Sequence, residues 1–205
     1  MNYSDLARRF LGTKEGSQQH HHIIDEYNKI KPLPNGYRMT YRDAWCACFV
    51  SYVLSKCGAV KAPYSASAND MRSKAIHYGE YRREGPKVND IVFYDWKHSG
   101  HIDHVGIVSK VDGNTIEVIE GNKNDSVGKR IIDKHSTLIA GYATVPQKTP
   151  AKKPKTDHEK EIVGIAHDVI KGKFSNGKTR IALLKKRGVD PNEVQAKVNE
   201  LLRSK

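Results

Sequence analysis

The chain has 205 residues, a formal net charge of +12 at pH 7 and a hydrophobic content of 38%. That length can supply the core of one domain of ordinary size and of a small second one. No apolar run reaches the ~18 residues that a membrane span requires, and Met1–Leu6 lacks the apolar segment of a signal peptide. We therefore expect a protein with no membrane span that is made in the cytoplasm and needs another route to act outside the cell.

The charge is unevenly distributed along the chain. Residues 1–146 hold 20 Lys+Arg and 16 Asp+Glu, which gives +4, whereas residues 147–205 hold 15 and 7, which gives +8. A basic tail of this kind suits a polyanionic partner such as nucleic acid, anionic lipid or an anionic cell-wall polymer. On charge alone, a solvated basic face that only aids solubility is an equally good interpretation.

The first part of the chain has the apolar spacing of helices. Short helices are predicted over residues 4–11 and 22–30, and the prolines and glycine of residues 31–36 break the pattern. A longer helix is predicted from Ala44 to Lys56, and because it is apolar on nearly every side we expect it to be buried centrally. Residues 65–78 are expected to be helical in part.

Beyond residue 90 the apolar pattern changes to a period of two. Strands are predicted over residues 91–94, 104–111, 115–119 and 139–145, with a hairpin turn at Asp112-Gly113-Asn114. Helices come first and strands follow, which is the order typical of an α+β domain. We therefore predict N-terminal helices packed on an antiparallel sheet.

The last quarter of the chain has the pattern of a separate helical unit. Residues 147–157 form a basic linker with two prolines and no large apolar side chain. Helices are predicted around Ile162–Ile170, over Lys178–Arg187, and after the capping box that begins at Asp190 and places Pro191 first in the helix. The predicted organisation is a domain over residues 1–146, a linker over 147–157 and a three-helix domain over 158–205.

Cys46 has the sequence position of a reactive cysteine. With Asp43 as N-cap, the predicted helix puts Cys46 in its first turn, where free backbone N–H groups and the helix dipole favour the nucleophilic thiolate. Cys48 and Cys57 lie deeper in the helix, and we interpret them as core residues. A metal pair at Cys46 and Cys48 lacks a second pair at zinc-like spacing. Three cysteines in one helix are typical of thiols in a reducing compartment, not of disulfides.

A cysteine nucleophile needs a base, and His104 is the candidate. His104 opens an apolar strand, so the sheet should fix the position of its ring. His98 and His101 precede it at intervals of three, which raises the alternative of a shared metal site. Because Ser99-Gly100 argues against a helix here, we interpret these two histidines as loop residues.

Glu120 and Asn122 are candidates for the groups that assist the base. One residue separates them, so on an extended strand they share a face. One could accept a hydrogen bond from Nδ1–H of His104 and fix its tautomer, and the other could donate to a developing oxyanion. The alternative for Glu120 is an exposed carboxylate at the end of a strand.

At these residues the chain resembles the CHAP family of cysteine amidohydrolases and peptidases, relatives of NlpC/P60 in the papain-like superfold. The matching segments are Trp45-Cys46-Ala47, Asn89–Trp96, His104–Val108 and Ile119–Asn122. The resemblance implies a papain-like fold in which Cys46 is the nucleophile and His104 the base. It also implies Glu120 and Asn122 as orienting polar groups, and no cofactor.

Some CHAP enzymes carry an Asp-x-Asp calcium loop before the cysteine. Residues 37–42 of this chain lack that pattern, so the resemblance implies neither calcium nor any other metal. The chain is also similar to CHAP-like lysins of bacteriophages of Gram-positive hosts, a similarity that includes Leu11–Gly16.

The C-terminal unit resembles a single CW_7 (Cpl-7-type) cell-wall-binding repeat. The matching residues include Ala166, Phe174, Asn176-Gly177, Arg180, Leu183-Leu184 and Val194–Asn199. The resemblance implies Phe174, Gly177 and Arg180 as substrate-binding residues. It implies bacterial peptidoglycan as the partner, with anionic wall polymers as a further contact. Family members often have Trp where Phe174 stands.

These observations lead to the hypothesis of a phage endolysin that is made in the host cytoplasm and acts on the cell wall after release. It would cut an amide bond of peptidoglycan, either as an N-acetylmuramoyl-L-alanine amidase or as an endopeptidase. The alternative is a non-catalytic wall- or nucleic-acid-binding protein with an inert CHAP-like domain. Nucleic acid is not expected, because the third predicted tail helix carries few cations, with Lys197 and Arg203 the main ones. A deubiquitinase-like cysteine protease is a third alternative.

Overall fold

The computed structural model describes residues 1–147 and 157–203. Its contacts divide the chain into two compact units, Met1–Lys148 and Thr149–Lys205, each with a hydrophobic core of its own. The predicted linker over residues 147–157 lies outside the described residues except for the residue at each end.

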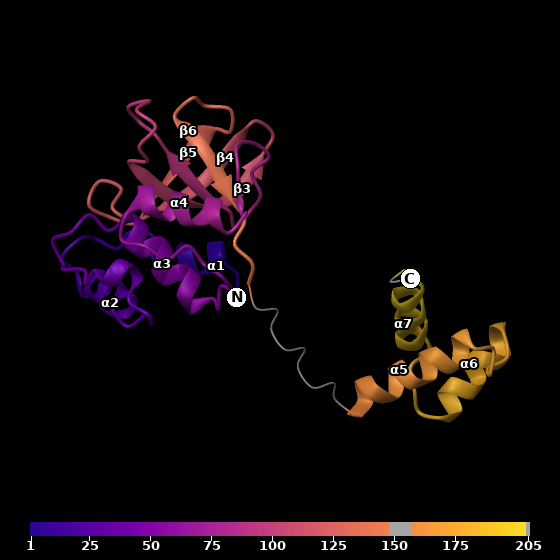
Figure 1. The fold of residues 1–205 in the computed structure, drawn as a ribbon. Coiled ribbons are helices and arrows are strands. Elements are labelled where there is room, and N and C mark those ends of the chain that lie inside the picture. Colours follow the sequence, from indigo (N-terminus) through magenta and orange to yellow (C-terminus); the bar gives the residue numbers. More distant parts are fainter. Residues whose placement is uncertain (148–156, 204–205) are drawn as a thin grey trace. The chain divides into compact units, whose positions relative to one another are not determined.

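The N-terminal unit begins with its helices, which gather beside the sheet (Figure 1). Their bounds are α1 (Tyr3–Arg8), α2 (Gln18–Tyr27), the 3-10 turn η1 (Pro34–Gly36), α3 (Cys46–Lys56) and α4 (Ala68–His77). Asn2, Ser17 and Ser67 begin α1, α2 and α4, each accepting a hydrogen bond from the backbone N–H three residues further on. These side-chain caps determine where the three helices start.

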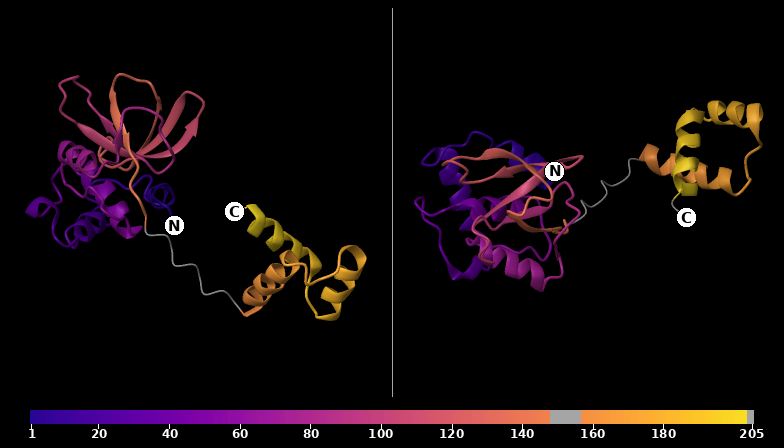
Figure 2. Two further views of the ribbon diagram at one scale, coloured as in Figure 1. Left: turned by 45° about the vertical axis from the view of Figure 1, so that its right-hand side comes forward. Right: turned by 90° about the horizontal axis from the view of Figure 1, so that it is seen from above.

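The second half of the unit forms one antiparallel sheet, seen turned in the left view of Figure 2. The strands are β1 (Tyr81–Arg82), β2 (Ile91–Tyr94), β3 (His104–Asp112), β4 (Thr115–Glu120), β5 (Gly128–Asp133) and β6 (Ile139–Ala143). Their order across the sheet is β1-β6-β2-β3-β4-β5. The end of β2 therefore pairs with the start of β3 through Tyr94 and His104, and the end of β4 pairs with the start of β5 through Glu120 and Gly128.

Helix α3 lies at the centre of the N-terminal unit, between α2 and strands β3 and β4. Its residues from Cys46 to Leu54 are all buried, which confirms the central position predicted from its apolar surface. The opposite face of the sheet has a second, smaller cluster that includes Val92, Tyr94 and Tyr142. Strand β2 is buried on both faces, which explains its unbroken apolar run.

The α+β class and the antiparallel sheet are confirmed, but some elements differ from the predictions. Helix α2 begins at Gln18 and not at residue 22, because the Ser17 hydroxyl accepts a hydrogen bond from the backbone N–H of His20 and caps the helix there. Strands β1 and β5 were not predicted at all. β5 has no clear apolar face, since Ile131 is 73% exposed and Lys129, Arg130 and Asp133 of the strand are charged.

The C-terminal unit contains the three predicted helices, α5 (Asp157–Ile170), α6 (Gly177–Lys186) and α7 (Pro191–Arg203). Both α5 and α6 contact α7. The Asp190 carboxylate accepts a 2.9 Å hydrogen bond from the backbone N–H of Asn192 at the start of α7. The buried residues of this unit are Ile162, Ile165, Ala166, Val169, Leu184, Val189, Val194 and Val198. Within the described part of the chain, no helix has the length and apolar character to cross a membrane.

Candidate active site

Cys46 is the first residue of α3 and is 8% exposed. The backbone N–H groups of a first helical turn have no acceptor inside the helix, so the sulfur lies beside free donors and the positive end of the helix dipole. The prediction that Asp43 caps this helix is wrong. The Asp43 carboxylate closes its own turn by accepting hydrogen bonds from the Thr40 backbone N–H at 2.6 Å and hydroxyl at 3.0 Å.

Trp45 anchors the start of α3. It has no exposed surface, and its Nε1–H donates a 3.0 Å hydrogen bond to the Glu15 carboxylate. The indole lies 4.7 Å from the ring of His20 and makes an edge contact with Phe49. Because the residue immediately before Cys46 is held from several sides, the position of Cys46 is determined by the core and not by a capping side chain.

His104 is the first residue of β3, and its ring interacts with the Cys46 thiol. Its side chain is 13% exposed. Burial lowers the pKa of His104, but the contacts with Cys46 and Glu120 outweigh that effect and raise the pKa to about 9. The imidazole is therefore protonated at neutral pH.

Glu120, the last residue of β4, lies on the other side of the imidazole. Its carboxylate has no exposed surface, and Oε2 is 3.3 Å from Nε2 of His104. The expectation that Nδ1 would face the orienting group is therefore wrong, and Nδ1 is the nitrogen left to face Cys46. Nε2 meets no acceptor at full hydrogen-bond geometry among the described residues, so its contact with Glu120 is a charge pair. The alternative of an exposed strand-end carboxylate is excluded by the burial of Glu120.

Glu120 is also bound by Arg130 of β5, a residue that the sequence reasoning missed. Nε of Arg130 donates to Oε1 at 2.7 Å, and Nη2 donates to Oε2 at 3.0 Å. Burial raises the pKa of Glu120, but its contact with His104, its hydrogen bonds from Arg130 and the charges of both groups outweigh burial and bring the pKa below its usual value. Because β5 was not predicted, the sequence did not indicate that Arg130 pairs with Glu120. It showed only that a cation follows Glu120 by ten residues.

Two aromatic rings, one at the end of β2 and one just beyond it, lie beside Arg130 and His104. Tyr94 and Trp96 stack with centroids 4.4 Å apart and planes 13° apart. The Arg130 guanidinium lies 4.8 Å from the Trp96 ring and 5.5 Å from the Tyr94 ring. The centroid of the His104 ring lies 6.1 Å from that of Trp96 and 5.9 Å from that of Tyr94. Both aromatics belong to the Asn89–Trp96 segment, but the sequence pattern alone indicates no role for them.

Two glycines allow the close approach of the elements that carry the site. A Cβ on Gly121 would lie 2.5 Å from Cβ of Phe49, so only glycine lets the end of β4 contact α3 this closely. A Cβ on Gly106 would lie 2.8 Å from Cγ of Glu120. The space for the Glu120 side chain therefore requires glycine at position 106, and the close approach of β4 to α3 requires glycine at position 121.

Asn122 does not lie on an extended strand. β4 ends at Glu120, and Asn122 has a φ of 55°, in the left-handed region. The prediction that it shares a strand face with Glu120 is therefore wrong, because the chain turns between them. Among the described residues the half-buried Asn122 side chain has no hydrogen bond, so its role as a polar group of the site stays a prediction.

The other two cysteines are separated from this chemistry. Cys48 has no exposed surface, and burial raises its pKa well above the usual range. Burial also raises the pKa of Cys57, whose Sγ lies 3.5 Å from the Asn2 carbonyl oxygen. Neither thiol is favoured as a nucleophile.

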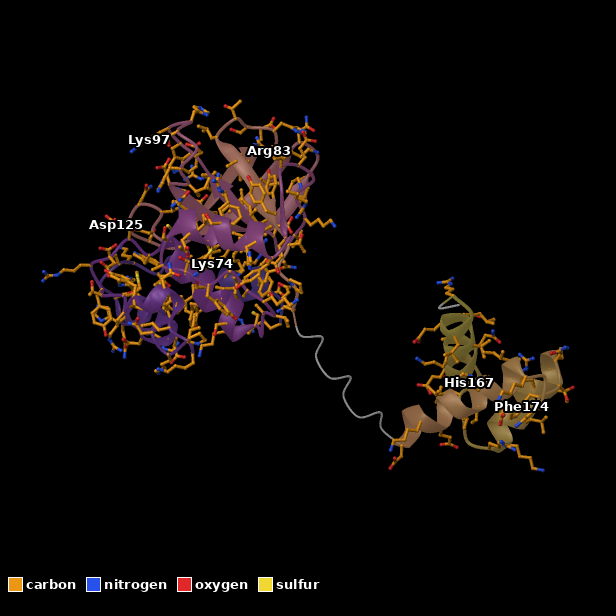
Figure 3. All side chains as sticks on the ribbon, viewed as in Figure 1. Lys74, Arg83, Lys97, Asp125, His167 and Phe174 are labelled. Carbon is orange, nitrogen blue, oxygen red and sulfur yellow. The ribbon has the colours of Figure 1, made fainter. Side chains whose placement is uncertain are left out.

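The loop between β2 and β3 holds the remaining candidate ligands, and Lys97 marks it in Figure 3. His98 and His101 are exposed in this loop, and neither joins His104 in a cluster. Within the described residues, no group of three or more histidine, cysteine or acidic side chains is arranged to hold a metal ion.

In the C-terminal unit the predicted substrate-binding residues lie at and after the turn between α5 and α6, where Figure 3 labels Phe174. Arg180 donates to the Ser175 carbonyl at 2.9 Å and to the Asn176 side chain at 2.7 Å, and Gly177 begins α6 with a φ of 60°. The Phe174 ring is covered by the guanidinium of Arg187 at 5.3 Å. Arg187 was not predicted.

Two protein-family models match separate parts of the chain. The model of the CHAP domain matches residues 36–122, and the model of the CW_7 repeat matches residues 164–202. No curated protein matches the chain. Among solved structures, the crystal structure of Ly7917 is similar with a TM-score of 0.38 and 19% identity, over 49% of this chain and 53% of that one. The chain thus spans about half the length of that protein.

The matched CHAP region contains Cys46, His104, Glu120 and Asn122, and the α+β unit around it fits a papain-like fold. The matched CW_7 region contains Phe174, Gly177 and Arg180. The chain therefore carries a CHAP domain followed by a C-terminal CW_7 repeat.

Proposed function

We propose that this protein is a phage endolysin, in which Cys46 is the nucleophile that cuts an amide bond of peptidoglycan. A CHAP domain indicates a cysteine- and histidine-dependent amidohydrolase or peptidase acting on peptidoglycan, and a CW_7 repeat indicates cell-wall binding. The observation that carries the catalytic proposal is the continuous line of contacts from Cys46 through His104 to Glu120.

The proposed reaction uses Cys46 as the nucleophile and the protonated His104 as the proton donor. The Cys46 thiolate attacks the carbonyl carbon of the scissile amide, and the C–N bond breaks as the His104 imidazolium gives its proton to the leaving amine. This leaves a thioester on Cys46 and a neutral imidazole. Water then attacks the thioester, gives a proton to His104 and releases the acid, which restores the thiolate and the imidazolium.

The developing oxyanion needs donors, and the start of α3 offers them. The backbone N–H groups of the first turn, beginning with Cys46, have no acceptor within the helix. The side-chain amide of Asn122, which has no hydrogen bond among the described residues, adds a further donor in this proposal. Glu120 holds the imidazole in one orientation through Nε2.

The C-terminal unit supports a tethering role. With +8 over residues 147–205, it is suited to adhesion on anionic wall polymers, while specificity for the wall would come from the residues around Phe174. A tether raises the effective concentration of the catalytic unit at an insoluble substrate. Release from the host cytoplasm before the enzyme reaches the wall is part of the same proposal.

The amidase and the endopeptidase use the same catalytic groups, so the bond must be identified from the products. Purified walls should be digested with the wild-type chain and with Cys46→Ala, and the soluble fragments analysed by mass spectrometry. An amidase releases stem peptides with a free N-terminal alanine, whereas an endopeptidase cuts within or between the peptides. Fragments produced equally by Cys46→Ala, or cleavage only between sugars, would contradict the proposal.

A further inference from the structure

We infer that Arg130 is a positioning residue that keeps the Glu120 carboxylate ionised and in one orientation while His104 gains and loses its proton. This inference rests on the proposed function. It is carried by the two-pronged contact of Arg130 with Glu120, by the burial of Glu120 and by the aromatic surface on which the guanidinium lies.

Arg130 compensates the negative charge of Glu120. The Glu120 carboxylate has no exposed surface, and an isolated buried carboxylate takes up a proton to avoid the loss of hydration. Before the reaction the His104 imidazolium compensates its charge, but in the thioester stage the imidazole is neutral. Arg130 stays protonated throughout, so it is the cation that remains beside Glu120 in that stage.

Arg130 also fixes the orientation of the Glu120 carboxylate. Nε and Nη2 of Arg130 contact different oxygens of Glu120, at 2.7 and 3.0 Å, which fixes the plane of the carboxylate. In that plane Oε2 lies 3.3 Å from Nε2 of His104. The imidazole is thereby held with its other nitrogen towards Cys46.

The side chain of Arg130 is itself held by two aromatic rings. Its side chain is 30% exposed, yet its guanidinium lies over the stacked rings of Trp96 and Tyr94. A planar guanidinium can contact an aromatic face and a carboxylate edge at once, whereas a lysine ammonium cannot form the two parallel hydrogen bonds. Arginine is therefore required here for its shape as well as for its charge.

The test compares Arg130→Gln and Arg130→Lys with a matched control, Lys129→Gln. Lys129 is the neighbouring residue on β5 and pairs with Glu117, at 3.2 Å, instead of Glu120. The groups that face the Glu120 carboxylate are His104 from β3, Arg130 from β5 and the Tyr94 hydroxyl from β2, with Cys46 of α3 acting through His104. Each variant is assayed on purified walls for kcat, KM and the pH profile of kcat/KM.

We expect Arg130→Gln to lower kcat on the order of 10- to 100-fold with KM within twofold, because the imidazole loses its alignment. Its acid limb should move to higher pH, since Glu120 without the guanidinium takes up a proton more readily. Arg130→Lys should restore much of the acid limb but little of kcat, and Lys129→Gln should match the wild type. A wild-type profile in Arg130→Gln, or a loss of kcat with unchanged limbs in both Arg130 variants, would overturn the inference.

A second measurement does not require wall hydrolysis. The rate at which iodoacetamide alkylates Cys46 is followed against pH by peptide mass spectrometry in the same four proteins. The acid limb of alkylation should move to higher pH in Arg130→Gln and stay in place in Lys129→Gln. If the wild type cuts no walls but this shift is present, the proposed function fails and the positioning role stands; if the shift is absent, the positioning role fails.

Discussion

His104 lies between a thiol and a fully buried carboxylate, and both contacts favour its protonated form strongly enough to outweigh burial. In the proposed mechanism the imidazolium is the group beside Cys46 that protonates the leaving amine. Glu120 contributes by stabilising that proton, and Arg130 prevents the carboxylate from taking it.

This arrangement predicts a high alkaline limit for hydrolysis. Because the pKa of His104 is raised to about 9, its proton is present below that pH and is lost as the pH rises through it. The initial rate on purified walls should therefore fall above about pH 9. The isosteric variant Glu120→Gln removes a charge that raises the pKa of His104, so its alkaline limb should lie at lower pH. Identical alkaline limbs in the two proteins, measured where tryptophan fluorescence shows both folded, would contradict this prediction.

At the level of elements, the site is assembled where α3, β3 and β4 meet, and its dimensions depend on two glycines. Gly121 brings the end of β4 onto Phe49, one turn along α3 from Cys46. Cys46 and Glu120 thereby reach opposite sides of one imidazole. A side chain at Gly121 has to separate the strand from the helix.

We predict that Gly121→Ala reduces both stability and activity. The added Cβ would lie 2.5 Å from Cβ of Phe49, and overpacking of this kind costs about 1–3 kcal/mol of unfolding free energy. Gly128→Ala is the matched control on the adjacent strand, since the atoms nearest its Cβ belong to the flexible Lys123 side chain, the first at 3.1 Å. Urea unfolding is followed by tryptophan fluorescence, which reports on the N-terminal unit alone because Trp45 and Trp96 are the two tryptophans of the chain. Equal stability of the two variants would disprove the close contact.

The sequence predicted that Cys46 and His104 belong to one site, which the structure brings together, but it predicted only part of their surroundings. Cys46 and His104 could be found because each opens an element with a strong apolar pattern. Asp43 was misplaced as a cap because its carboxylate has a closer partner in Thr40. Arg130 could not be found because β5 is an edge strand with a mixed pattern, and edge strands need no continuous apolar face.

At the level of the whole molecule, catalysis and wall attachment are assigned to separate units, each with its own core. The small unit presents Phe174 beneath Arg187 at the turn between its first two helices. An aromatic ring with a cation beside it is a surface suited to bind a sugar–peptide polymer through contact area as well as charge.

We predict that Phe174→Ala weakens attachment to walls. The measurement uses the Cys46→Ala background, which prevents cleavage. The dissociation constant for purified walls is obtained from the fraction of protein that sediments with them. Phe174→Ala should raise this constant about fivefold or more. Leu202→Ala is the matched control, because Leu202 is an exposed apolar residue of the same unit, 54% exposed on α7. Binding that disappears with salt and is the same in both variants would show that charge alone holds the protein on the wall.

The most direct test of the account compares Cys46→Ala with Cys48→Ala, two residues apart on α3. Purified walls are incubated with each variant, and the free amino groups released are measured against time. We predict that Cys46→Ala lowers the initial rate by several orders of magnitude. Cys48→Ala, which removes a fully buried thiol, should stay within a few-fold of the wild type once its folding is checked. Amine release by Cys46→Ala at the wild-type rate would contradict the assignment of this sulfur as the nucleophile.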